Sequence, residues 1–170
     1  MVVQEFPQIL RKILILELAS LILVILSFYL SISNYSSLPN IYPIHFDYSG
    51  TPNGWTRKSW SDVLGLPLLQ LGIFSFITVL TMWEVYSVKP RAYPDEKQKT
   101  IRLLSAIFIN VLNFLISFLI ITINYQLLQA EMTGRGDSLF GIVFAVVICL
   151  VAGVIAIKKI ISAIIHTLER

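Results

Sequence analysis

The sequence predicts an all-α integral membrane protein with four transmembrane helices and an ordered cap between the first two. Hydrophobic residues make up 56 % of the chain and charged residues only 14 %, whereas a soluble domain has about 25 % charged residues. Four apolar windows also exceed the roughly 18 residues that cross a bilayer. Each must be helical, because lipid offers the backbone no hydrogen-bond partner. The windows lie at 13–33, 63–88, 101–128 and 139–157.

The distribution of Lys and Arg predicts the orientation of these helices. The whole chain, 1–170, reads as one membrane domain. Ten of its thirteen Lys and Arg residues fall on the side of the N-terminus, and three fall on the other side. The positive-inside rule then predicts a multi-pass protein of the cell membrane with both termini cytoplasmic and residues 34–60 outside, as an outer cap. The net charge of +3 therefore indicates membrane topology, and no nucleic acid is expected as a partner.

Two helix faces are predicted to hold the bundle together. Lipid tails are as apolar as leucine, so small residues and interhelical hydrogen bonds must supply the association. The third predicted helix places Asn110 and Asn113 on one face with Ser117 and Asn124. The fourth carries small residues at steps of three or four, namely Gly141, Ala145, Cys149, Ala152 and Ala156. We expect these faces to form the bundle seam or a seam to a protein partner or second copy. The alternative is a polar ion pathway along the third helix.

Two acidic residues lie inside predicted helices, about one turn from the cytoplasmic edge. They are Glu17 in the first helix and Glu84 in the second, and Arg102 and Lys158 lie at a similar depth. We expect an ion-pair cluster that fixes the order of the helices. The functional alternative is a proton or cation site built from Glu17 and Glu84, because acids within membranes are commonly functional.

The predicted cap contains an extended stretch followed by a turn. Tyr42 precedes a proline, which favours extended backbone over 41–48. Strict alternation would place Tyr42, Ile44 and Phe46 on one face and His45 with Asp47 on the other. Residues 49–54 are dense in turn formers. Ser59, with Asp62 three residues later, predicts the start of the second helix. Trp55 and Lys58 are expected at the membrane interface, where the lysine can meet phosphate headgroups.

The same stretch carries a dense motif, L-P-x-x-x-P-x-H-F-x-x-x-G-x-P-x-x-W-x-x-K. The residues that fit it are Leu38, Pro39, Pro43, His45, Phe46, Gly50, Pro52, Trp55 and Lys58. This pattern resembles the family called domain of unknown function 1648, which also forms the N-terminal part of SdpI-type immunity proteins. The resemblance implies a membrane fold and an immunity-like or sensing role. This chain has Asn53 where the family often has an acidic residue.

Enzymatic and metal-dependent functions are not expected, and no cofactor is predicted. Zinc sites usually need three or four ligands. The two histidines, His45 and His166, fall on opposite sides of the membrane by the predicted topology. The chain has no H-E-x-x-H motif and no phosphate-binding glycine loop. For His45 and Asp47 we expect a hydrogen bond to each other or to loop backbone.

The leading functional interpretation is a non-enzymatic membrane protein whose outer cap binds a peptide, a lipid or a protein partner. The cap residues expected to take part are His45, Phe46, Asp47, Gly50, Pro52, Asn53, Trp55 and Lys58. One alternative is a small accessory or assembly subunit of a larger membrane complex, docked through the small-residue face. A second alternative is an oligomeric ion or proton transporter component that uses the intramembrane acids and amides. Membrane lipid is a partner in each case.

Overall fold

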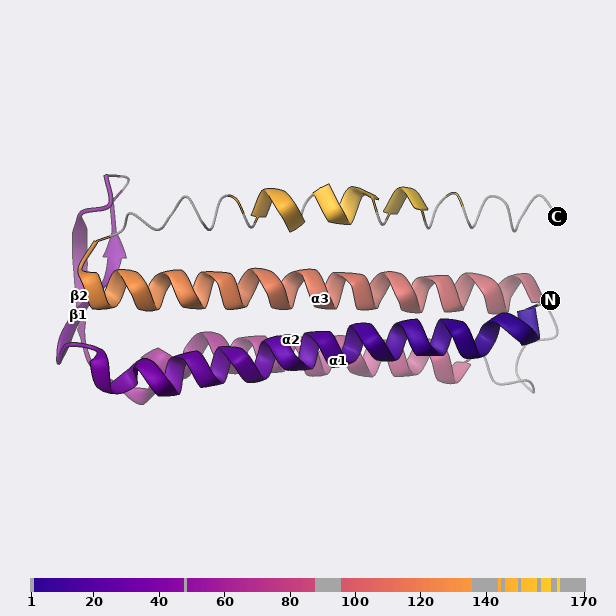
Figure 1. Ribbon diagram of the computed structural model, residues 1–170, viewed down its shortest axis with the longest axis horizontal. Helices are drawn as coiled ribbons and strands as arrows, with labels where there is room; N and C mark the ends of the chain where they lie inside the picture. The colour runs from indigo at the N-terminus through magenta and orange to yellow at the C-terminus, as the bar shows by residue number, and fades with distance from the viewer. Residues whose placement is uncertain are drawn as a thin grey trace.

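Three long helices and a short two-stranded sheet make up most of the structure, a computed structural model (Figure 1). It describes residues 2–47, 49–87 and 96–135, and then 144, 146–149, 151–155, 157–159 and 162. The elements are α1 (Val2–Asn34), a 3-10 turn η1 (Tyr35–Ser37), β1 (Ile41–Phe46), β2 (Pro52–Arg57), α2 (Trp60–Ser87) and α3 (Glu96–Thr133). The helices lie side by side, and the β1–β2 hairpin stands across one end of them.

Three helices are long and apolar enough to cross a membrane in the part of the chain that the structure describes. The spans are Pro7–Ser37, Trp60–Tyr86 and Gln98–Thr133. The chain is therefore a mostly helical membrane protein with several spans. The fourth predicted helix, 139–157, falls partly outside the described residues. Those that are described between 144 and 162 are helical and run beside α3 (Figure 1), where Cys149 Sγ donates a hydrogen bond to the Leu115 carbonyl at 3.5 Å.

The observed helices are longer than the apolar windows predicted. α1 begins at Val2 instead of near residue 13, and α3 covers Glu96–Thr133 instead of 101–128. The windows find only the lipid-soluble part, whereas a helix continues through Gln, Glu, Lys and Arg because these residues are good helix formers. A helix of 33 residues is about 50 Å long, against a hydrocarbon core of about 30 Å. The helices are therefore longer than the hydrocarbon core is thick.

The interior of the bundle contains many polar side chains beside apolar ones such as Leu103 and Ile120, and much of the outside is apolar. Large hydrophobic side chains such as Ile22, Phe76 and Val79 are exposed, as lipid-facing residues are. The buried polar side chains of the three helices are Ser20, Ser27, Ser31, Gln70, Thr81, Asn110, Asn113, Ser117 and Asn124. Several of these residues form interhelical hydrogen bonds, which contribute to helix association where hydrophobic burial would act in a soluble bundle.

One amide anchors α3 to α1. Asn124 Nδ2 donates to the Ser27 carbonyl at 3.2 Å, to Ser27 Oγ at 3.1 Å and to Ser31 Oγ at 3.1 Å. A second set of bonds joins α3 to α2. Asn110 Nδ2 donates to Thr81 Oγ1 at 2.9 Å, and Gln70 Nε2 donates to the Ser117 carbonyl at 3.2 Å. These bonds fix the level of each helix relative to its neighbours.

Candidate functional site

The hairpin is docked on the end of the bundle by a small apolar cluster. Leu38, Tyr42, Val63 and Leu128 are buried together, and Leu30, Tyr35 and Met132 pack against them. The cluster joins residues before and within β1 to the first turns of α2 and the last turns of α3. Because side chains of β1 and of all three long helices meet there, the hairpin is held as a fixed cap.

Lys58 closes the base of the cap. Its Nζ donates to the Leu38 carbonyl at 2.9 Å and to the Ser36 carbonyl at 3.4 Å. The same ammonium lies 4.7 Å from the centre of the Tyr35 ring, which stacks on Trp60 at 3.6 Å between ring centres. This lysine, expected to meet lipid phosphate, is therefore engaged within the cap. It satisfies carbonyl groups left over at the end of η1.

The strict alternation predicted for β1 fails at Pro43, which is buried, and at Ile44, which is exposed. β1 pairs antiparallel with β2, with Tyr42 opposite Thr56 and Pro43 opposite Trp55, and the register shifts between Pro43 and His45. The irregularity falls at Ile44, which is 52 % exposed although alternation would have placed it with buried Tyr42. Ile44 is an unpaired residue of β1, and a second register shift between His45 and Phe46 leaves Asn53 of β2 unpaired. Beyond Ile44 the pattern resumes, with His45 exposed and Phe46 half-buried. Sequence alternation alone does not reveal such an insertion.

The turn between the strands is built on Asp47. Its Oδ1 accepts hydrogen bonds from Ser49 N at 2.8 Å, Ser49 Oγ at 2.6 Å and Thr51 N at 3.0 Å. These bonds hold the pKa of the Asp47 carboxyl below its usual value, and the bond from the Ser49 hydroxyl has the largest effect. Gly50 has a φ of 79°, a conformation that favours glycine. Two of the predicted cap residues, Asp47 and Gly50, thus form the turn itself.

His45 bonds across the hairpin and does not bond Asp47. Its Nδ1 donates to Asn53 Oδ1. The strands approach closely here, because a Cβ added at Gly54 would lie 3.0 Å from His45 Cβ. Gly54 is a cap residue that sequence reasoning missed, and its signal was a glycine within an extended run. In the part of the chain that the structure describes, no three His, Cys, Asp or Glu side chains converge as metal ligands.

The side of the hairpin that does not contact the bundle exposes apolar side chains. Ile41 and Trp55 are each 58 % exposed, Ile44 is 52 % exposed, and Arg57 is exposed beside Ile41 in the strand register. Phe46 and Pro52, two further predicted cap residues, are half-buried opposite each other. We call Ile41, Ile44, Trp55 and Arg57 the outward face of the cap.

The comparison with known families concerns this same segment. Residues 22–71 match the family model for the domain of unknown function DUF1648. The match confirms the resemblance drawn from the motif, and it covers less than a third of the chain. The DUF1648 segment comprises the second half of α1, the whole hairpin and the first turns of α2. No curated protein and no solved structure matches the chain.

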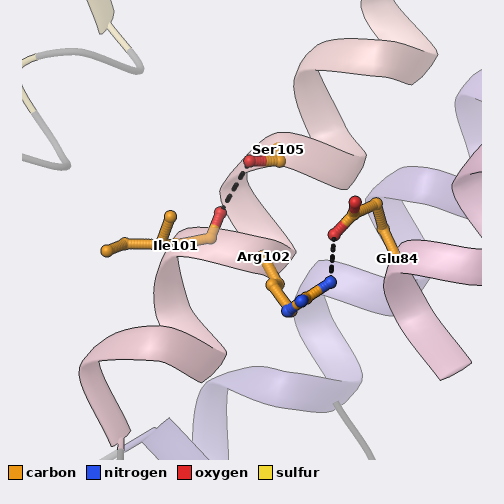
Figure 2. Close-up of polar contacts among 4 residues, drawn as sticks. All are labelled: Glu84, Ile101, Arg102 and Ser105. Carbon is orange, nitrogen blue, oxygen red and sulfur yellow. Dashed lines mark hydrogen bonds and ion pairs between the residues drawn. The ribbon is translucent and has the colours of Figure 1, made fainter. Parts of the chain in front are cut away.

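Beyond the DUF1648 segment, the structure brings together two of the four residues predicted as an ion-pair cluster. Arg102 Nη1 of α3 lies 3.2 Å from Glu84 Oε2 of α2, and Figure 2 shows the two side chains pointing toward each other. One turn further along α3, Ser105 Oγ donates to the Ile101 carbonyl at 3.0 Å (Figure 2). Lys158 is exposed on the helical residues 157–159.

Glu17 does not take part in the predicted ion pair. Its Oε2 accepts a hydrogen bond from Thr78 Oγ1 of α2 at 2.9 Å. Its Oε1 is buried and has no hydrogen-bond partner. The carboxyl group thus joins α1 to α2 through a hydroxyl instead of a cation, because Thr78 is the polar side chain that the α2 face presents at this level.

The predicted packing faces are placed as follows. Asn110, Asn113, Ser117 and Asn124 are all buried. Of the small face, Gly141, Ala145 and Ala156 lie outside the described residues, and Ala152 is half-buried. The α1 serines, Ser20, Ser27 and Ser31, were missed. Their spacing of seven and four residues on one helical face was the available signal.

Proposed function

We propose that this chain is a non-enzymatic protein of the cell membrane, with four spans and both termini cytoplasmic, whose outer cap binds an extended segment of a peptide or protein partner. The observation that carries the proposal is the outward face of the cap. It holds large apolar side chains that the bundle does not cover.

Exposed apolar residues on α1, α2 and α3 are explained by lipid, but those of the cap are not. The hairpin stands across the helix ends, so its outward face points away from the bundle and along the membrane normal. We place this face at the headgroups or in water, because the helices are longer than the hydrocarbon core is thick. Apolar patches exposed to water commonly mark protein interaction sites.

The hairpin also suggests how a partner would bind. In the described residues the sheet has two strands, so each strand has one edge that does not pair with the other strand. An extended peptide can add to such an edge through main-chain hydrogen bonds, with alternate side chains giving specificity. Ile41 and Trp55 would take apolar side chains, and Arg57 favours an acidic one. Because the hairpin is already ordered by its contacts with the bundle, less conformational entropy is lost when a partner binds, which favours affinity.

Site-specific photocrosslinking in intact cells tests the proposal. A photoreactive benzophenone side chain at Ile41 should form a discrete adduct with one polypeptide, and the substitution Ile44→Asp should abolish it. A matched probe at Phe76, which is equally exposed but lies in the middle of α2, should give no such adduct. Adducts with lipid alone at Ile41 would make the cap a membrane anchor and overturn the proposal.

The proposed orientation has its own test. In a Cys149→Ser background, cysteine placed at exposed Ser49 should react with a membrane-impermeant thiol reagent added to whole cells. Cysteine placed at exposed Gln98, at the opposite end of the bundle, should react only after permeabilisation. The reverse result would put the cap in the cytoplasm.

A second candidate function, an oligomeric ion-conducting component, is favoured by one observation. Both polar side-chain atoms of Asn113 are buried without a hydrogen-bond partner, as are Gln70 Oε1 and Asn110 Oδ1. Unpaired amide oxygens inside a membrane bundle can bind water or a cation. Ion flux in liposomes that is lost with Asn113→Leu, and retained with Ser105→Ala, would support it. No flux above that of empty liposomes would exclude it.

A further inference from the structure

An apolar groove of about 880 Å³ lies between α1 and α2, at the end of the bundle away from the hairpin. Leu10, Ile13, Leu14, Val79 and Met82 are among the side chains that line it. Leu14, Val79 and Met82 are exposed, so the groove opens to the outside of the bundle. It is a lipid-facing groove, and any occupant must reach it from within the membrane.

One acidic side chain lines this groove. Glu17 uses Oε2 to accept the hydrogen bond from Thr78, while its Oε1 is buried without a partner. An oxygen of this kind is costly in an apolar environment unless a donor or cation reaches it. The groove is therefore complementary to an apolar surface that carries one positive charge.

The chain itself presents such a surface beside α3. The described residues 144–159 expose one run of apolar side chains at helical spacing, Phe144, Val147, Ile148, Val151, Val154 and Ile155. Lys158 continues the run, since it lies seven residues after Val151 and four after Val154. Residues spaced this way share one helix face. Lys159, one position further on, points about 100° away.

The hydrogen bonds of the bundle show that Lys158 and Glu17 lie at similar depths. Glu17 bonds Thr78 and is therefore at the level of Thr78. Thr81 bonds Asn110 and lies about one turn farther from the hairpin than Thr78. Because α3 runs toward the hairpin, the level of Thr78 is reached about three residues after Asn110. Glu17 is thus level with about residue 113 of α3.

On the other side of α3, Leu115 contacts both Cys149 and Gly153. The level of Glu17 therefore corresponds to about residue 153 in the helical residues 144–159. Lys158 lies five residues, about 7.5 Å, beyond that level, away from the hairpin.

We propose that the groove between α1 and α2 receives the exposed face of residues 144–159 of a second copy of this chain, with Lys158 of that copy bonding Glu17. A bilayer holds copies of one protein at equal depth, so the small difference in level is kept between copies. Helical side chains lean toward the helix N-terminus, which directs Lys158 back toward the level of Glu17. The contact joins two different surfaces, so the copies associate head to tail. This inference is independent of the function proposed for the cap.

Cysteine crosslinking between differently tagged copies tests this contact in native membranes. In a Cys149→Ser background, one copy carries Val79→Cys in the groove and the other carries Ile155→Cys on the exposed face. By the levels above, these positions lie within about one residue of each other. The matched control is Leu80→Cys, which is exposed on α2 but does not line the groove. We expect heterodimers from the pair 79 and 155 on mild oxidation and a background level from the pair 80 and 155.

Charge reversal then tests the role of the ion pair. Lys158→Glu or Glu17→Lys alone should lower the crosslinking yield roughly five-fold or more, because like charges then meet across the contact. Combining Glu17→Lys in the groove copy with Lys158→Glu in the other should restore the yield, and the control Lys159→Glu should leave it unchanged. Crosslinking no greater than that of the control pair, single reversals without effect or a double reversal without rescue would each overturn the proposal. A groove filled only by lipid gives the first of these results.

Discussion

Tyr42 offers the sharpest test of how the cap is held, because its ring and its hydroxyl group have opposite effects. The side chain is 1 % exposed and packs in the cluster with Leu38, Val63 and Leu128. The hydroxyl oxygen is buried without a hydrogen-bond partner. A buried polar group left unpaired costs about 1 to 3 kcal/mol. The substitution Tyr42→Phe keeps the ring and removes that cost, less the packing lost with one oxygen atom.

We therefore expect Tyr42→Phe to raise the free energy of unfolding by about 1 kcal/mol, whereas Tyr42→Ala should lower it by roughly 3 to 5 kcal/mol. The assay is reversible unfolding of the purified protein in mixed micelles with increasing denaturing detergent, followed by tryptophan fluorescence. Tyr35→Phe is the matched control, and it should change the free energy by less than about 0.5 kcal/mol because Tyr35 acts through ring stacking. A loss of stability in Tyr42→Phe would refute the reasoning. It would mean that the hydroxyl donates to a carboxylate such as Glu131.

The difference in the free energy of unfolding between Tyr42→Phe and the wild-type protein should also depend on pH, which provides an independent measurement. The pKa of Tyr42 is raised from 10.0 to about 12. Burial is the main cause, and the nearby charges of Glu131, Asp62 and Tyr35 add to it. Above pH 10 the unfolded chain loses this proton while the folded chain keeps it, so the stability that depends on Tyr42 falls as the pH rises from 10 to 12. The fall amounts to roughly 1.4 kcal/mol per pH unit. The advantage of Tyr42→Phe should therefore widen between pH 10 and 11.5, and a constant difference would contradict the assigned burial.

Three further substitutions probe the bundle and the cap. Asn124→Leu should lower the free energy of unfolding in micelles by about 1 to 2 kcal/mol, because it removes three interhelical hydrogen bonds that average about 0.6 kcal/mol each. An unchanged free energy of unfolding would show that these contacts are not formed. Gly54→Ala should destabilise the hairpin by about 1 to 3 kcal/mol through the contact with His45, seen as faster proteolysis in the loop, whereas unchanged protection would refute the close approach. Glu84→Gln should lower stability by about 1 kcal/mol or less because the pair with Arg102 is partly exposed, and a loss above 3 kcal/mol would mean that the pair is deeply buried.

Much of the fold could be predicted from the sequence, because lipid imposes simple rules on each helix. The apolar windows located the three long helices, and the Ser59 signal located the start of α2. There Ser59 Oγ accepts a hydrogen bond from Asp62 N at 3.2 Å. The extended backbone of 41–46 and a turn after it also follow from local preferences, but the predicted turn 49–54 was too long, because β2 begins at Pro52. Helix ends could not be predicted, because polar helix formers carry no hydropathy signal.

The candidate site was less predictable, because its contacts depend on register. The motif pointed to the right segment, and Asp47 bonds loop backbone as expected, but two other residues have different partners. His45 bonds Asn53, and Lys58 bonds backbone carbonyls instead of lipid. A one-residue bulge places Ile44 on the exposed side of the cap. Local sequence does not show the bulge, because the register of β1 depends on its pairing with β2.

Composition and spacing alone determined that this chain crosses a membrane several times and carries one structured segment between its first two spans. Those features follow from the transfer of each residue between water and lipid, which is a property of the residue and its neighbours in the chain. Only the tertiary structure decided that Glu17 bonds Thr78 rather than a cation and that serines of α1 bond Asn124. It also decided that the Tyr42 side chain is buried between the hairpin and the bundle. Such pairings depend on the levels at which separate helices meet, and those levels are set by all the interhelical contacts together.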